Sequence, residues 1–177
     1  ALVWTSFFCC KASAVANRLN RIMSYKTATT PQELRYDYDY KPEMLEKYGR
    51  IFSPEHISKY SSKISNICDK IRKSKGIVMI YSQYIDGGVV PMSLALEEMG
   101  FTRYGQGVKP LFKNKPSELV DVRTMKVPED KKKFMPARYA MITGETRLSP
   151  NNDFEVKGLT NDDKKNGNIE GHKIKVV

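Results

Sequence analysis

The sequence predicts an α/β fold in which helices flank a parallel sheet. A helical pattern that begins at residue 53 and ends at residues 74–76 is followed by an uninterrupted apolar run over residues 77–81, which is typical of a strand buried on both faces of a parallel sheet. A second helical pattern over residues 91–99 then leads to a strand-like segment at residues 101–104. Strands that alternate with helices pair in parallel through right-handed crossovers.

The first helix has a clear start and one apolar face. Ser53 is suited to accept from the free backbone N–H groups, Pro54 fits the first helical position, and Glu55 complements the positive end of the helix dipole. Apolar residues at spacings of three, four, three and four then form a stripe: Ile57, Tyr60, Ile64, Ile67 and Ile71. The basic residues off this stripe are better explained as a solvated face than as a binding surface.

The second helix is bounded by proline and glycine. Pro91 marks its first turn, and Gly100 followed by apolar Phe101 is typical of a left-handed C-terminal stop with a hydrophobic contact. Further on, residues 137–144 resemble a strand that ends in a small-residue turn. Ser149 and Pro150 predict a short helix to about residue 159, and residues 174–177 predict one more strand. Residues 1–43 have no clear period, so we assign them no fold and treat them as a linker or the end of a preceding region.

Charge is unevenly distributed along the 177 residues. The chain has 30 Lys and Arg against 20 Asp and Glu, a formal charge of +10, and its apolar content of 40% excludes a wholly disordered polyelectrolyte. Residues 109–138 hold nine basic and four acidic side chains, which is half of the excess, and four prolines interrupt them. We expect a long basic loop over residues 109–136 and a polyanionic partner. No apolar run is long enough to cross a membrane, so no membrane contact is expected.

The residue inventory argues against several kinds of catalytic site. Cys9, Cys10 and Cys68 are an odd set without a C-x-x-C pair, which indicates a reducing compartment rather than a disulfide scaffold. The two histidines, His56 and His172, have no flanking ligands at zinc spacing. There are two pairs of adjacent acidic residues, Glu97 with Glu98 and Asp162 with Asp163. The two side chains of each pair point apart, so neither pair resembles a matched acid and base, and we expect both to be surface charge.

Ligands of parallel sheets bind at the carboxyl ends of the strands. Here those ends are Ser82 and Gln83 with the loop at residues 86–88, and the segment at residues 143–146. Both offer hydroxyls, small residues and backbone N–H groups that can hold a phosphate oxygen. From its spacing alone, the Asp-Gly-Gly loop is better explained as a tight turn. Neither G-x-x-x-x-G-K-[ST] nor G-x-G-x-x-G occurs in the chain.

The order of these segments resembles the second RecA-like domain of a superfamily 2 helicase. The resemblance is strongest to the helicase-type ATPases of large nucleocytoplasmic DNA viruses, whose relatives include poxvirus early transcription factor and nucleoside triphosphate phosphohydrolase subunits. Residues 75–84 resemble motif IV of that group and residues 96–101 continue the likeness. Residues 141–145 and 148–152 resemble the next strand and turn, and residues 160–163 and 173–177 resemble the approach to motif V. The similarity covers residues 44–177 and implies a partial RecA-like domain with a long basic insertion.

The resemblance implies that this chain is an internal fragment of a longer enzyme. The P-loop and the Asp-Glu pair of the first RecA-like domain would precede Ala1, and motifs V and VI would follow Val177. ATP and Mg²⁺ would therefore be bound by the full-length parent and by no residue of this chain alone, so no catalytic residue is assigned. The implied partners are DNA or RNA, the missing N-terminal RecA-like domain and viral transcription machinery. The implied location is the host cytoplasm (viral factory) or the virion, and otherwise an intracellular, reducing compartment.

By the same resemblance, residues of the two strand ends would face the bound nucleic-acid strand: Ser82, Gln83, Gly87, Gly88, Thr143 and Gly144. The basic residues Lys131, Lys132, Lys133 and Arg138 would add a salt-sensitive electrostatic contribution. A solvated loop explains the lysine run equally well. Two other functions stay open: a stand-alone basic nucleic-acid-binding module without ATPase activity, and a small α/β enzyme that binds a nucleotide or cofactor at residues 86–88.

Overall fold

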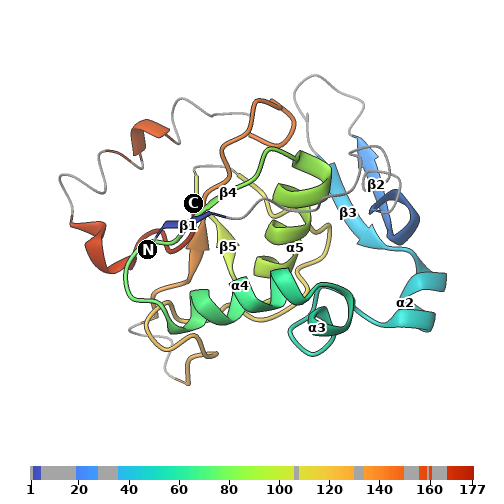
Figure 1. Cartoon of the computed structure of the whole chain (residues 1–177), viewed down its shortest axis with the longest axis horizontal. Helices are drawn as coiled ribbons and strands as arrows, with labels where there is room; N and C mark the ends of the chain where they lie inside the picture. The colour runs from blue at the N-terminus through green and yellow to red at the C-terminus, as the bar shows by residue number, and fades with distance from the viewer. Residues whose placement is uncertain are drawn as a thin grey trace.

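A computed structural model describes residues 2–4, 19–27, 36–105, 108–129, 134–149, 156–158, 160 and 167–177 (Figure 1). The elements in chain order are β1 (Leu2–Trp4), β2 (Met23–Thr27), β3 (Tyr36–Tyr40), α2 (Pro42–Tyr48), α3 (Ile57–Tyr60), α4 (Ser62–Lys73), β4 (Met79–Tyr81), η1 (Ile85–Val89), α5 (Val90–Glu98), β5 (Thr102–Arg103), β6 (Arg138–Tyr139) and η3 (Asn168–Glu170). Within these residues no helix is both long enough and apolar enough to cross a membrane.

Parallel pairing joins five segments into one array. β1 pairs in parallel with β4, and β5 pairs in parallel with β6. The C-terminal segment, residues 174–177, lies between these two pairs, because Val176 bridges in parallel to both Val78 and Tyr139. The order across the array is therefore β1, β4, the C-terminal segment, β6 and β5. The prediction of an α/β fold with parallel strand pairing is therefore confirmed.

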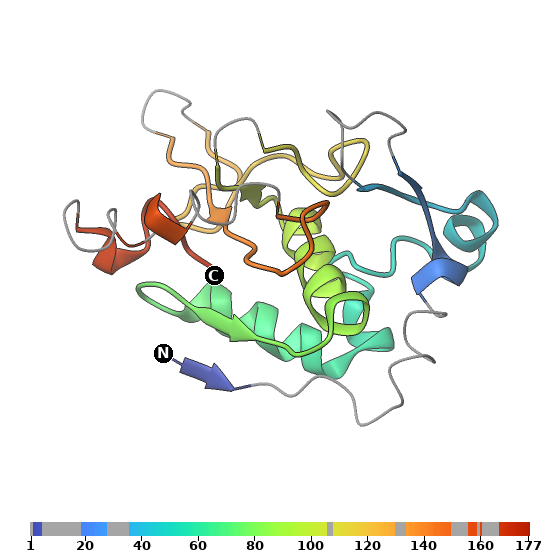
Figure 2. The same ribbon diagram turned by 90° about the horizontal axis from the view of Figure 1, so that it is seen from above.

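The path of the chain brings distant segments together. From β4 the chain passes through α5 to β5 at the far edge, and then returns through β6 to the C-terminal segment beside β4. Figures 1 and 2 show this return, with the C-terminal end close to β4. All five segments point the same way, so their carboxyl ends lie at one edge of the array. The antiparallel hairpin of β2 and β3 lies to one side of it (Figure 1).

The helix predicted to begin at residue 53 and to end at residues 74–76 is divided, which corrects that prediction. Residues 53–56 form a turn, α3 follows, and Ser61 is extended with φ −152° and ψ 94°. The Ser61 hydroxyl accepts from the backbone N–H of Ile64 at 3.2 Å and so begins a new helix, α4. A serine hydroxyl competes for backbone N–H groups in this way, which explains the break. Of the predicted stripe, Tyr60 is 44% exposed, whereas the four isoleucines are buried.

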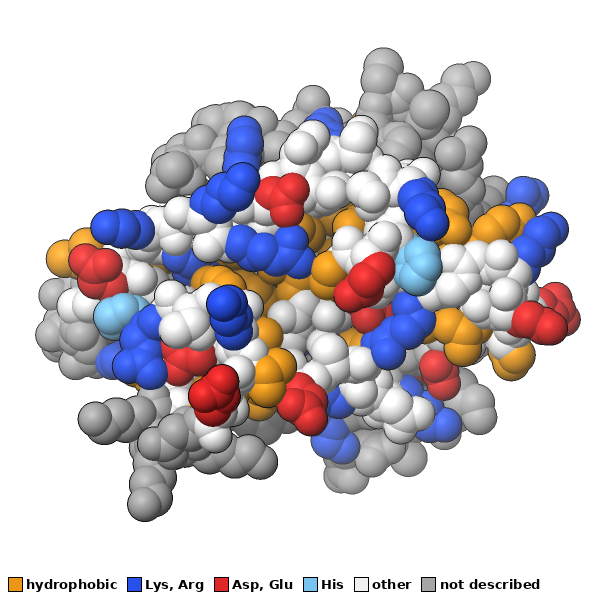
Figure 3. All heavy atoms as spheres, turned by 90° about the horizontal axis from the view of Figure 1, so that it is seen from below, with side chains coloured by type: hydrophobic (Ala, Val, Ile, Leu, Met, Phe, Trp, Pro, Cys, Tyr) orange, Lys and Arg blue, Asp and Glu red, His pale blue; other side chains and the backbone are white. Residues whose placement is uncertain are grey.

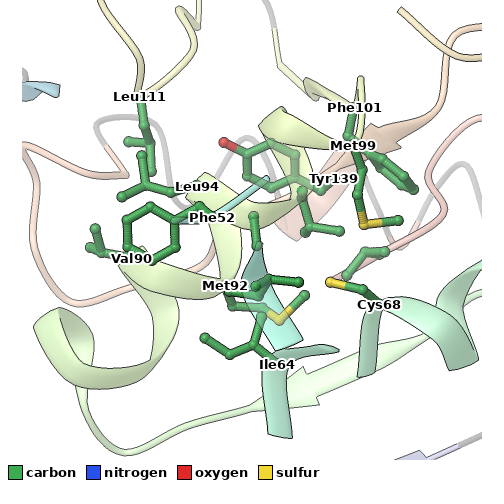
Figure 4. Close-up of a cluster of buried hydrophobic side chains, with 14 of the residues drawn as sticks. Phe52, Ile64, Cys68, Val90, Met92, Leu94, Met99, Phe101, Leu111 and Tyr139 are labelled. Atoms are coloured by element: carbon green, nitrogen blue, oxygen red, sulfur yellow. The ribbon is translucent and has the colours of Figure 1, made fainter. Parts of the chain in front are cut away.

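The second helix confirms its predicted boundaries. α5 begins at Val90 with Pro91 next to it, Gly100 has φ +88°, and the N–H of Phe101 donates to the carbonyl of Leu96 at 3.0 Å. Every α5 residue except Pro91 is buried. Figure 4 shows its side chains packed among residues of α4, β6 and two loops, including Ile64, Cys68, Phe52, Leu111 and Tyr139.

The prediction that the strand at residues 77–81 is buried on both faces is wrong. Val78 is 2% exposed, but Met79 and Tyr81 are 51% and 61% exposed. Successive side chains of a strand point to opposite faces, so one face of β4 packs on the core and the other is open among the described residues. An uninterrupted apolar run therefore does not by itself indicate cover on both sides.

The described residues of the basic loop, 109–129 and 134–136, contain no helix or strand, and they are anchored to the core. Leu111, Phe112, Val120 and Val122 are all buried. The backbone N–H of Val120 donates to the carbonyl of Gly100 at 3.1 Å, which holds the loop against the end of α5. The hydrophobic residues of this loop follow neither the helical nor the strand periodicity, so the sequence pattern does not predict that they belong to the core.

Candidate nucleic-acid interface

The two predicted strand ends meet. Ser82 and Gly88, which follow β4, and Ala140 and Met141, which follow β6, line the same small cavity of about 40 Å³. The carboxylates of Asp86 and Glu145 also interact: burial, and then the charge of Glu145, raises the pKa of Asp86. The loop of residues 82–88 and the segment of residues 143–146 are therefore neighbours at the carboxyl edge of the array. We call them together the strand-end surface.

The Asp-Gly-Gly loop is neither a simple tight turn nor an open phosphate loop. Gly87 and Gly88 belong to the π-helix η1, which leads directly into α5. Gly88 is buried and Gly87 is half-buried. The N–H of Val90 donates to the carbonyl of Ile85, five residues earlier. Single π-helical turns are frequent at functional sites, because they displace side chains and backbone from the regular helical path.

The hydroxyls of Ser82 and Thr143 are already used in local turns. The Ser82 hydroxyl donates to the carbonyl of Tyr84 at 3.1 Å and accepts from the N–H of the same residue at 3.2 Å. The Thr143 hydroxyl bonds to Ser149 Oγ at 3.2 Å, and Ser149 Oγ donates to the carbonyl of Met141 at 2.7 Å. These hydroxyls shape the two loops, and a phosphate would have to replace existing bonds to reach them.

Gln83 and Gly144 are the accessible members of the predicted set. Both are exposed, and a Cβ placed on Gly144 would meet no atom within 4 Å. A carboxamide donor and an uncrowded backbone are therefore available to a ligand on this surface. Exposed Arg147 follows in the same loop. Arg147 is the one basic residue among residues 143–149, which also include the acidic residue Glu145.

Arg138, a basic residue of the predicted set, does not lie at the strand ends. Arg138 is the first residue of β6, five residues before Thr143, and so lies toward the amino end of the parallel strands. Its carbonyl accepts from the N–H of Lys175 at 2.9 Å. Lys131, Lys132 and Lys133 lie outside the described residues, so their position relative to the strand ends remains a prediction.

Glu97 and Glu98 are buried, which corrects their interpretation as surface charge. Glu97 is 2% exposed and accepts from the backbone N–H groups of Leu111 at 2.7 Å and Phe112 at 2.9 Å. The Tyr139 hydroxyl also donates to it at 2.6 Å. Burial raises the pKa of Glu97, and these three donors oppose that effect.

Glu98 points to the other side of α5. It accepts from the Tyr40 hydroxyl at 2.8 Å and pairs with Arg50 at 2.8 Å. Burial raises the pKa of Glu98 as well. A signal for both was present in the sequence: a helix that is apolar on all sides is buried, and carboxylates within such a helix need partners.

The described residues gather no metal-ligating cluster, and the cavity at the strand ends is small. Among them, no three His, Cys, Asp or Glu side chains gather closely enough to hold a metal ion. The cavity of about 40 Å³ beside the Asp-Gly-Gly loop is also far smaller than the several hundred Å³ of a small-molecule site. We therefore derive no step of nucleotide chemistry from these residues. In comparisons with family models, curated proteins and solved structures, nothing matches this chain.

Proposed function

We propose that this chain contributes nucleic-acid backbone contacts, and one wall of the interdomain ATP cleft, to an ATP-dependent superfamily 2 helicase or translocase. The observation that carries the proposal is the shared cavity of Ser82, Gly88, Ala140 and Met141. The sequence resemblance places nucleic-acid contacts in these same two segments, and they lie together at the carboxyl edge of a parallel array, where open α/β sheets bind ligands. The RecA-like identity itself rests on the sequence resemblance.

The contacts would be made by neutral donors. The Gln83 carboxamide and the backbone around Gly144 are exposed, whereas Asp86 and Glu145 give this surface negative charge. Backbone amides and carboxamides position a phosphate without reading the base sequence, as a motor that moves along a strand requires. In the parent, ATP binding would close the two RecA-like domains and hydrolysis would reopen them, so that the grip moves along the strand.

A stand-alone basic nucleic-acid-binding module is the alternative. It is favoured by the +10 charge, half of which lies in residues 109–138. In this case the affinity would come mainly from phosphate neutralisation and would fall steeply with salt. The two proposals differ in which residues matter: the strand-end surface in the first, and the lysine run in the second.

The experiment that tests the proposal introduces a charge with little change of shape. Gln83→Glu places a carboxylate on the strand-end surface, and Asn66→Asp makes the same amide-to-acid change on the exposed face of α4. A carboxylate about 6 Å from a phosphate in water weakens binding by about 0.7 kcal/mol, or about threefold. Fluorescence anisotropy with a homopolymeric single strand, DNA and RNA in turn, should show this loss for Gln83→Glu alone. Equal affinities of the two variants would contradict the proposal.

A further inference from the structure

A pair of exposed tyrosines lies far from the strand-end loops in sequence. Tyr48 ends α2 and Tyr60 ends α3, and the two are 41% and 44% exposed. Their rings stand perpendicular with centroids 6.4 Å apart, and the Tyr60 hydroxyl donates to the Tyr48 carbonyl at 3.0 Å. Leu45, 42% exposed, is next to them on α2. The pair is thus held in a fixed geometry while much of its aromatic surface stays accessible.

The helix that carries Tyr48 is unusual in burying nothing. None of the seven residues of α2 is buried. At 100° per residue, Leu45 lies about 60° from Tyr48 around the helix, whereas Glu43 and Glu46 lie about 140° or more away. The apolar side chains therefore share one face, and the carboxylates are on the other. This face is available to a ligand without a nearby acidic group of the same helix.

Basic groups border the tyrosines. The ammonium of Lys47 lies 5.2 Å from the centroid of the Tyr48 ring, within the range of a cation–π contact. Lys59 precedes Tyr60 and is exposed. On the side of the molecule that carries α2 and α3, Figure 3 shows Lys and Arg side chains next to hydrophobic ones, around one of the two imidazoles.

A polar cleft adjoins the tyrosine pair. Its volume is about 260 Å³, and Arg50, Ser53, Glu55, His56, Glu98 and Ser117 are among the residues that line it. Gly49 connects it to Tyr48: this residue has φ +68°, and the His56 ring lies so close that a Cβ on Gly49 would be 3.3 Å from Cε1. His56, which lines the cleft, therefore lies close to Gly49, the residue that follows Tyr48.

The groups of the cleft favour a base over a phosphate. Arg50 binds Glu98 through Nε and Nη2, and Nη2 also donates to the Pro116 carbonyl. The two bonds to Glu98 and the bond to the Pro116 carbonyl do not involve the third guanidinium nitrogen, Nη1. A hydrogen bond from Ser53 lowers the pKa of Glu55, so its carboxylate is ionised at neutral pH. An ionised carboxylate repels phosphate, but it accepts hydrogen bonds from the amino groups of bases. Phosphates would then lie outside the cleft, toward Lys47 and Lys59.

We propose that the exposed faces of Leu45, Tyr48 and Tyr60, together with the adjoining cleft, form a second contact for single-stranded nucleic acid, in which unpaired bases stack on the tyrosines and one base enters the cleft. We call this the tyrosine surface. Aromatic side chains bordered by basic groups are the usual equipment for binding single strands without sequence preference. The proposal shares only the class of ligand with the proposed function, because its residues are separate from the strand-end surface.

The test uses the whole chain and a single strand of about ten nucleotides that contains 2-aminopurine, a length within the span of known single-strand sites. Tyr48→Leu and Tyr60→Leu should each reduce affinity about fivefold or more, since one stacked base contributes about 1–3 kcal/mol. The salt dependence should not change, because no charge is removed. Tyr48→Phe keeps the ring and should bind like the wild type. Both positions are exposed, so circular dichroism melting should confirm that the variants fold.

The outcomes separate this proposal from the previous one. If both leucine variants bind like the wild type while Gln83→Glu weakens binding, the tyrosine surface is wrong and the strand-end surface stands. The opposite result would keep the tyrosine surface and contradict the strand-end surface. A duplex of the same sequence should bind the wild type and Tyr48→Leu equally, because paired bases cannot stack on a side chain. A wild-type chain that binds no single strand would overturn both.

Discussion

The hydroxyl of Tyr139 donates a 2.6 Å hydrogen bond to the carboxylate of Glu97. Tyr139 belongs to β6 and Glu97 to α5, and both groups are almost fully buried. The same carboxylate holds the backbone of Leu111 and Phe112. One side chain thereby joins the helix that follows β4, the strand that precedes Thr143, and the basic loop. The relative position of the two strand ends depends on this junction.

We expect Glu97→Gln to destabilise the fold. A carboxamide has one acceptor oxygen, and its NH₂ group would face a backbone N–H, so at least one buried donor would lose its partner. The free energy of unfolding should fall by about 2–3 kcal/mol in urea denaturation. Glu46→Gln, an exposed change of the same kind on α2, should stay within about 0.5 kcal/mol of the wild type. Equal effects of the two substitutions would show that the junction is not stabilising.

A second prediction concerns glycine at the end of α5. Gly100 has φ +88°, and a Cβ there would lie 2.3 Å from the carbonyl oxygen of Glu118. Gly100→Ala should therefore destabilise by about 2–4 kcal/mol, the sum of a left-handed conformation and a steric clash. Gly144→Ala is the matched control, since its Cβ would meet nothing within 4 Å and should leave stability within about 0.5 kcal/mol. Thermal melting of both variants would distinguish them, and similar melting temperatures would refute the geometry.

The ends of α5 illustrate what the local sequence could predict. Pro91 and Gly100 set the ends of α5 through their own backbone preferences, so the boundaries of this helix could be predicted correctly from nearby residues alone. The break at Ser61 was missed because serine also occurs within helices, and only its bond to Ile64 decides the matter. The burial of Glu97 depends on Leu111 and Phe112, whose aperiodic segment gave no signal of packing on α5.

The candidate site was likewise predictable only in part. The general rule for parallel strands correctly placed the loop after β4 beside the segment after β6. The rule says nothing about which hydroxyls are free, and the bonds of Ser82 to Tyr84 and of Thr143 to Ser149 are local details of the two turns. The tyrosine pair was missed because Tyr60 fitted the apolar stripe of a continuous helix. Once Ser61 divides that helix, Tyr60 lies on α3, beside Tyr48.

Acid should destabilise the protein partly through Asp121. Arg123 and the N–H of Met135 bind this carboxylate, and the hydrogen bonds from Arg123 hold the pKa of Asp121 well below its usual range. A depressed folded-state pKa gives stability that is present above the unfolded value of about 3.9 and is lost as pH falls below it. Asp121→Asn should lower the melting temperature at pH 7 and flatten its decline between about pH 4 and pH 2. Parallel melting curves for the two proteins across this range would contradict the role of Asp121.

The lysine run provides a prediction about salt. If Lys131, Lys132 and Lys133 each neutralise a phosphate, their joint replacement by Ala should reduce the slope of log affinity against log salt by about 2 for a single strand. Anisotropy titrations at several salt concentrations measure this slope. An unchanged slope would rule out this part of the basic loop as a contact and leave it as a solvated segment.

The most direct test of the central claim is chemical-shift mapping of the backbone amides during titration with a homopolymeric single strand. If the strand-end surface grips the phosphate backbone, the largest changes should include the amides of Gln83 and Gly144, which lie 61 residues apart in sequence but at one edge of the array. A second group of changes around Tyr48 and Tyr60 would support the tyrosine surface. Saturating nucleic acid that leaves the amides of residues 82–88 and 143–146 unchanged would contradict the account.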